Sequence, residues 1–121
     1  MKIKLFIIIA LFLSIQSCDN SDATVLFRVI NKSENDILVH AKGIHHEIES
    51  SLLPDQSLAL QLMIGVTTSP TVSDEYFSSI DFDTIQIYQN GNLIEKDFLD
   101  RENWVFENHE QDFGIYELTI D

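Results

Sequence analysis

The feature that most constrains the fold is the alternation of apolar and polar side chains, with a period of two, in short runs after residue 23. Successive side chains of a strand point to opposite faces, so such runs predict strands rather than helices. The clearest run is Leu58–Ile64, where Leu and Ile alternate with Ala, Gln and Met. The runs predict strands at Thr24–Ile30, Ile37–Ala41, Ile44–Glu49, Leu58–Ile64, Ile85–Tyr88, Leu93–Glu95, Trp104–Glu107 and Tyr116–Ile120.

Turn signals separate these runs at intervals near ten residues. Asn90-Gly91 favours a type I′ hairpin because both residues tolerate positive φ, and Pro54-Asp55 favours a β-turn. Residues 65–79 break the alternation and predict a long connection, with one helical turn beginning at Ser73. We therefore expect an all-β fold, an antiparallel β-sandwich of about seven or eight short strands. Its predicted buried residues are Phe27, Val39, Leu60, Leu62, Ile87, Trp104 and Leu118.

Size and charge limit the organisation and the partners. The chain has 121 residues, which is enough for one small domain with a core but not for two. It carries 20 acidic residues against 7 basic ones, a formal charge of -13. Such a surface repels nucleic acid and anionic lipid headgroups, so we expect no nucleic-acid partner.

The first 17 residues have the order of a bacterial export signal. Lys2 and Lys4 precede an apolar run from Leu5 to Leu13, and the small Ser17 stands directly before Cys18. The run is too short to span a membrane, which takes about 20 apolar residues. We therefore predict a signal peptide at 1–17, a polar tether at 18–23 and a β-sandwich domain at 24–121.

The segment Ile15-Gln16-Ser17-Cys18 resembles the lipobox of bacterial lipoproteins. The resemblance implies cleavage between Ser17 and Cys18 and acylation of Cys18, with diacylglycerol on its sulfur, so that the membrane becomes a partner through this lipid. The alternative is an ordinary secretory signal with an accidental cysteine. Cys18 is the only cysteine of the chain, so it has no intramolecular disulfide partner.

The polar residues after the cysteine, Asp19 to Asp22, resemble export signals of Bacteroidetes-type lipoproteins, which implies the outer membrane. Under the enteric rule, an Asp after the Cys implies inner-membrane retention, so both membranes stay open. The segments Val29–Ser33 and Leu53–Ser57 also resemble parts of small Bacteroidetes-type envelope lipoproteins, most of which have no assigned function.

A further segment, Asp112–Leu118, resembles the Asp-x-Gly-x-Tyr-x-apolar corner of immunoglobulin-like domains. The resemblance implies an immunoglobulin-like sandwich in which the hydroxyl of Tyr116 bonds to upstream backbone.

Possible metal ligands are present, but their spacing does not favour a site. The four histidines are His40, His45, His46 and His109; adjacent His45 and His46 would point to opposite faces of a strand. The acidic groups Asp81/Asp83 and Asp97/Asp100/Glu102 lack the Asp-x-Asp-x-Asp-Gly calcium loop. We predict no metal site, the alternatives being a transition-metal site or a weak calcium site.

The sequence has no Gly-x-Ser-x-Gly elbow and no phosphate-binding glycine loop, so we expect neither catalytic residues nor a cofactor. Tyr88, Tyr76 and Trp104 are candidates for a sugar or peptide surface, with Trp104 assigned to the core. The expected function is a non-enzymatic, lipid-anchored accessory or protein-interaction module of the bacterial cell envelope. The alternative is a lipoprotein that binds a small ligand or calcium.

Overall fold

A computed structural model describes residues 23–67, 71–110 and 112–121. The described chain forms eight strands and two short 3-10 helices. The elements are β1 (Thr24–Asn31), β2 (Ile37–Lys42), β3 (Glu47–Leu52), β4 (Ser57–Ile64), η1 (Phe77–Ser79), β5 (Thr84–Gln89), β6 (Asn92–Leu93), η2 (Arg101–Asn103), β7 (Trp104–Glu110) and β8 (Phe113–Ile120).

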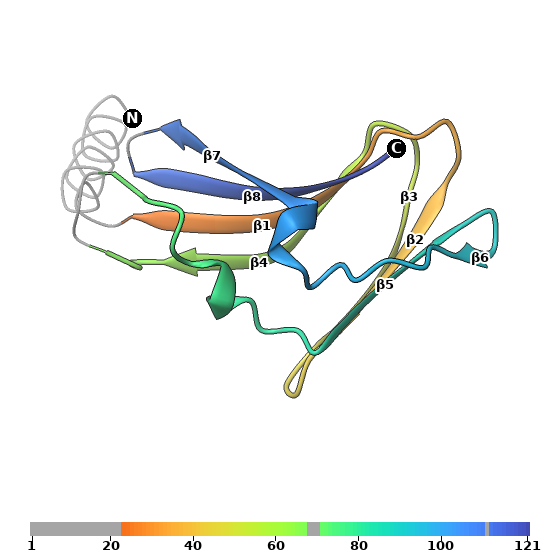
Figure 1. The fold of residues 1–121 in the computed structure, drawn as a ribbon, viewed down its shortest axis with the longest axis horizontal. Coiled ribbons are helices and arrows are strands. Elements are labelled where there is room, and N and C mark those ends of the chain that lie inside the picture. The colour runs from red at the N-terminus through yellow and green to blue at the C-terminus, as the bar shows by residue number, and fades with distance from the viewer. Residues whose placement is uncertain (1–22, 68–70, 111) are drawn as a thin grey trace, which may run out of the picture.

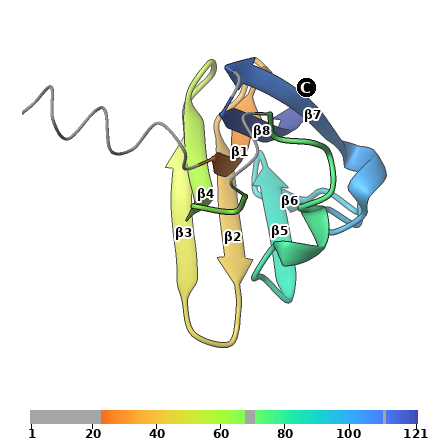
Figure 2. The ribbon, with the colours of Figure 1, turned by 90° about the vertical axis from the view of Figure 1, so that its left-hand side faces the viewer.

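The strands form two four-stranded sheets, which confirms the predicted all-β sandwich. One sheet has the order β4-β1-β8-β7 and the other β3-β2-β5-β6. Figure 1 shows the strands of the two sheets running at a steep angle to each other, and Figure 2 shows β3, β2 and β5 side by side. The neighbouring strands pair antiparallel except β1 and β8, which run parallel. These two strands are the first and the last of the eight in the sequence, so no hairpin forces them to be antiparallel.

The predicted Asn-Gly hairpin is confirmed. Asn90 and Gly91 have φ values of 54° and 77°, and they connect β5 to β6 as a two-residue loop. Positive φ at both central residues matches the right-handed twist of the paired strands. β6 is shorter than predicted, because only Asn92 and Leu93 pair with β5.

The strand expected at Ile44–Glu49 lies three residues later, as β3. Lys42 pairs with Glu47, so the residues between them form the turn, and the backbone N–H of Gly43 donates to the carbonyl of His46. Ile44 is therefore 79% exposed at the tip of the hairpin. A Cβ at Gly43 would overlap the carbonyl oxygen of Asp81, so this turn also needs glycine for close approach to the next segment.

The connection between β4 and β5 contains one short helix, but not where it was predicted. The helical turn is η1, which begins at Phe77 rather than at Ser73. The earlier part of the connection buries Val72 completely against the core. Val72 therefore packs this part of the connection onto the core.

A β-bulge at Leu60 reverses the two faces of β4. Phe27 pairs with Gln61 and the next residue of β1, Arg28, pairs with Ala59, so Leu60 is an extra residue on β4. Leu60 is buried, whereas Leu62 is 55% exposed. The prediction that Leu62 is buried was wrong. The apolar–polar alternation of the sequence continues through the bulge, but the extra residue sends the side chains that follow it to the opposite faces of the sheet.

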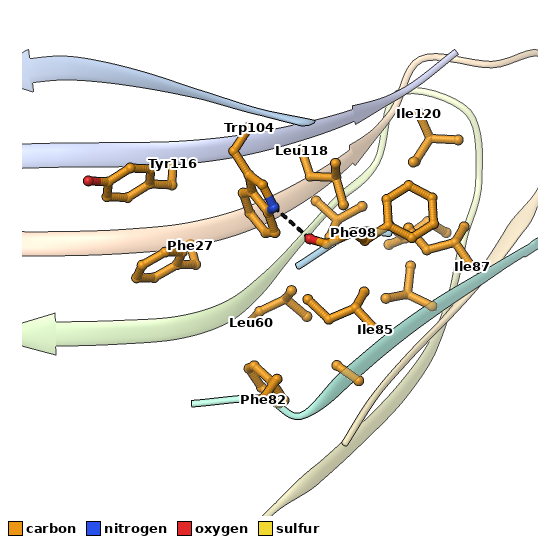
Figure 3. Packing of buried hydrophobic residues seen from close by; sticks show 14 of the residues in the cluster. Phe27, Leu60, Phe82, Ile85, Ile87, Phe98, Trp104, Tyr116, Leu118 and Ile120 are labelled. Carbon is orange, nitrogen blue, oxygen red and sulfur yellow. Dashed lines mark hydrogen bonds between the residues drawn. The ribbon is translucent and has the colours of Figure 1, made fainter. Parts of the chain in front are cut away.

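The core lies between the inner faces of the two sheets (Figure 3). Phe27 from β1 stacks on Tyr116 from β8, with ring centroids 4.8 Å apart, and meets Trp104 edge to face at 6.0 Å. The indole N–H of Trp104 donates to the carbonyl of Phe98 at 2.7 Å, which satisfies its polar atom inside the core. Of the residues predicted to be buried, six are confirmed: Phe27, Val39, Leu60, Ile87, Trp104 and Leu118.

Asn31 at the end of β1 is buried and joins two turns. The Nδ2 group of its side chain donates to the backbone carbonyls of Leu52, at 3.0 Å, and Asn35, at 2.8 Å. The Oδ1 atom of the same side chain accepts from the backbone N–H of Ser33. The backbone N–H of Asp55 donates to the backbone carbonyl of Asn31. The two segments that the sequence singled out, Val29–Ser33 and Leu53–Ser57, are therefore in direct contact.

Candidate functional site

Ser17 and Cys18, the predicted cleavage and lipidation residues, lie outside the described residues, as does most of the predicted tether. The domain nevertheless fixes where that segment enters. Thr24 is the first residue of β1 and pairs with Ile64 of β4 on one side and Phe113 of β8 on the other. The preceding segment therefore joins the domain at this end of the β4-β1-β8-β7 sheet.

The histidines are dispersed. His40 Nε2 lies 2.5 Å from a carboxylate oxygen of Glu47 on the neighbouring strand, and this hydrogen bond lowers the pKa of Glu47 below its usual value. His46 lies in the β2–β3 turn with its ring against Phe82, and His109 lies against Phe113. The structure does not bring these side chains together.

Two of the acidic residues considered for calcium, Asp97 and Asp100, hold the backbone of turns. A carboxylate oxygen of Asp97 accepts from the N–H of Leu99, and one of Asp100 accepts from the N–H of Glu102 at the start of η2. Among residues 23–67, 71–110 and 112–121, no group of three or more His, Cys, Asp or Glu side chains is placed to hold a metal ion.

The three aromatic candidates have different positions. Trp104 is in the core, as predicted. Tyr76 is half-buried at the residue before η1, where its backbone N–H meets Tyr116. Tyr88 lies on the outer face of the second sheet, where it lines a hollow. Only Tyr88 is therefore placed to contact a ligand in a depression of the surface.

This hollow has a volume of about 440 Å³, within the range of small-molecule sites. Its floor contains Leu38 and Tyr88, which pair across β2 and β5. Its polar lining includes Asp36, Ser51 and Asn90. The sequence suggested Tyr88 alone, because the other lining residues come together only through the register of three strands.

A second group of side chains ties two long connections to β8. The hydroxyl of Tyr116 donates to a carboxylate oxygen of Asp74 at 2.7 Å and accepts from the backbone N–H of Tyr76 at 3.1 Å. Arg101 of η2 forms an ion pair with the other oxygen of Asp74. It also lies over the ring of Tyr116, 5.3 Å from the centroid. The resemblance to the immunoglobulin-like corner implied the bond from Tyr116 to upstream backbone, and Tyr76 provides it.

Both acidic members of this cluster have shifted pKa values. The hydrogen bond from Arg101, with a smaller contribution from Tyr116, lowers the pKa of Asp74 below its usual value. Burial, together with the hydrogen bond to Asp74, raises the pKa of Tyr116 to about 12. At neutral pH the cluster is therefore an ionised Asp74, a charged Arg101 and a neutral Tyr116. These contacts hold the two connections against β8.

Asp74 and Arg101 stand in no recognisable sequence motif. They lie 42 and 15 positions from Tyr116, in two connections without a regular pattern. The corner motif around Tyr116 was the available signal, because a buried tyrosine hydroxyl needs a partner.

No protein-family model, no curated protein and no solved structure matches the chain. In the part of the chain that the structure describes, no helix has the length and apolar character needed to cross a membrane.

Proposed function

We propose that this protein is a lipid-anchored β-sandwich of the bacterial cell envelope, held at the outer membrane by acylation of Cys18. The observation that carries the proposal is the position of Cys18. It is the only cysteine, it ends the segment Ile15-Gln16-Ser17-Cys18, and it precedes the first residue of β1 by six positions. An anchor there leaves a short tether and a complete domain beyond it.

The role that we propose for the domain is that of a non-enzymatic accessory module that interacts with another envelope protein. The described polar clusters support this role, because their hydrogen bonds hold turns and loops in place. The formal charge of -13 favours a partner surface that is neutral or basic.

Replacing the anchor residue tests the proposal. We expect Cys18→Ser to abolish membrane retention and the uptake of labelled palmitate, because two or three acyl chains give stable anchoring and no basic patch replaces them. The measurement is fractionation of cells that express either protein after labelling. Equal sedimentation of both proteins with membranes, with no label in either, would contradict the proposal. Since Cys18 precedes the domain, the soluble variant should keep a β-rich circular dichroism spectrum.

The hollow at Leu38 and Tyr88 favours a second candidate function, the binding of a small neutral ligand. An aromatic and aliphatic floor with carboxylate, hydroxyl and amide groups around it suits a saccharide ring, which has apolar C–H faces and hydroxyl edges. The acidic chain disfavours anionic ligands. Calcium has less support, because the acidic loops use their carboxylates to hold backbone N–H groups.

A titration with a saccharide tests this second candidate. We expect an N-acetylglucosamine oligomer to shift the amide NMR signals of β2 and β5, and Tyr88→Ala to weaken its binding by roughly tenfold, since a factor of ten corresponds to a loss of about 1.4 kcal/mol. The matched control is Leu93→Ala. Leu93 pairs with Tyr88 but is not part of the hollow's lining, so its replacement should leave the affinity unchanged. Equal affinity of the wild type and Tyr88→Ala would exclude the hollow as the site.

A further inference from the structure

The β4-β1-β8-β7 sheet exposes large apolar side chains on its outer side. Leu62 is 55% exposed and Ile64 is 71% exposed, and the bulge at Leu60 turns both of them outward. Continuing across the sheet, Leu62 pairs with Leu26, and Leu26 pairs with Ile115. We call Leu26, Leu62, Ile64 and Phe113 together the outer apolar face; Ile115 lies beside them but is only 6% exposed.

This face lies at the end of the sheet where the tether enters. Thr24, the first residue of β1, pairs with Ile64 and with Phe113, both of which belong to the face. Six residue steps separate Cys18 from Thr24, and a fully extended chain covers at most about 3.6 Å a step, or roughly 20 Å. An anchor at Cys18 therefore keeps the outer apolar face within that distance of the membrane.

The opposite half of the same outer side contains charged side chains. Farther along the strands, Arg28 of β1 forms an ion pair with Glu117 of β8 at 2.6 Å, and the exposed Val105 of β7 pairs with Glu117. Leu62 and Ile64, the exposed apolar side chains of β4, lie in the half of the sheet that the tether holds near the bilayer. Isolated apolar residues on a surface need no explanation, but a group at the attachment point of an anchor is the arrangement that a membrane contact requires.

We propose that the outer apolar face rests on the bilayer to which Cys18 is anchored, with Leu62 and Ile64 entering the headgroup region. This inference rests on the proposed function, and it adds an orientation of the domain. The lipids that suit the face are zwitterionic, because Glu107 pairs with Ile115 at its border and the chain as a whole is acidic. A second copy of the chain is a less suitable occupant, because two chains of charge -13 repel each other.

Fluorescence quenching tests the proposal. The mature protein that begins at Cys18, purified with its lipid, is placed in phosphatidylcholine vesicles whose acyl chains carry bromine near the glycerol end. Two variants are compared, Ile64→Trp in the face and Ile44→Trp in the β2–β3 turn. Both isoleucines are highly exposed, at 71% and 79%, and both variants keep the buried Trp104 as a common background. Circular dichroism confirms that both are folded.

We expect bromine to quench Ile64→Trp severalfold more strongly than Ile44→Trp, at every ratio of protein to lipid. Equal quenching of the two variants would overturn the proposal. Quenching of Ile64→Trp that disappears as the protein is concentrated on the vesicle would identify a second copy as the occupant, and would overturn it as well.

Failure of the proposed function is recognised separately, by the absence of palmitate on Cys18. In that case the same two variants are attached through the Cys18 thiol to a maleimide-bearing lipid, so that the orientation is tested without biological acylation. Strong quenching of Ile64→Trp there would support the face as a membrane contact even if cells do not acylate Cys18. Equal quenching would reject the face alone.

Discussion

Leu60→Ala should lower the free energy of unfolding by about 2–5 kcal/mol, the usual cost of truncating a buried leucine. Leu60 is 5% exposed and belongs to the core. It is the extra residue of the bulge, because Phe27 pairs with Gln61 and the next residue of β1 pairs with Ala59. The removed side chain leaves a cavity that the surrounding sheet cannot fill. The measurement is urea unfolding of the wild type and the variant.

Leu62→Ala is the matched control for this prediction. It makes the same chemical change two residues away on the same strand, but at a side chain that is 55% exposed. Its effect on the free energy of unfolding in solution should stay within about 0.5 kcal/mol. Losses of similar size for the two variants would mean that β4 has no bulge and that Leu60 and Leu62 lie on the same face.

The protein should lose stability between pH 10 and about pH 12 through the ionisation of Tyr116. Its pKa is raised from 10.0 to about 12, so the unfolded chain releases this proton first as the pH rises. The stabilisation is therefore complete below pH 10 and lost as the pH passes about 12. A difference of two pKa units corresponds to roughly 2–3 kcal/mol.

Tyr116→Phe isolates this contribution. The variant should be less stable than the wild type at neutral pH, by about 1–3 kcal/mol, because the N–H of Tyr76 loses its acceptor. Its disadvantage should shrink as the pH approaches 12, since phenylalanine does not ionise. The measurement is the urea midpoint from pH 8 to 12, with Tyr88→Phe as the control for a tyrosine outside the cluster. A constant difference between wild type and Tyr116→Phe across this range would contradict the assignment.

The elements that could be predicted from the sequence are those set by local chemistry. Positive φ is available to Asn90 and Gly91 in any context, so their hairpin could be predicted. The strand at 58–64 could be predicted from its alternation, but the face that each residue presents could not. A bulge changes the register with the partner strand without changing the alternation in the sequence, so Leu62 was placed on the wrong side.

The candidate sites depend on contacts between distant segments, which a single sequence does not contain. The sequence identified Tyr116 and Tyr88, because an aromatic residue in a corner motif or on a strand is itself a signal. It did not identify Asp74 and Arg101, which reach Tyr116 from connections with no periodic pattern. Asp36 and Asn90 meet only because β2 pairs with β5 in one particular register.

Three of the four edge strands are bulged, irregular or very short, and this affects how neighbouring copies can meet. The fourth, β3, is regular but carries Glu47 and Glu49. β4 has its bulge at Leu60, β7 has an irregularity between Asn108 and Glu110, and β6 has only two residues. Charged, bulged or very short edges prevent one chain from adding its strand to another. With Cys18 acylated as proposed, the molecules would diffuse in two dimensions, where collisions between edges are frequent. Such a layer should stay fluid, with each domain rotating in the plane of the membrane and not joining its neighbours in a continuous sheet.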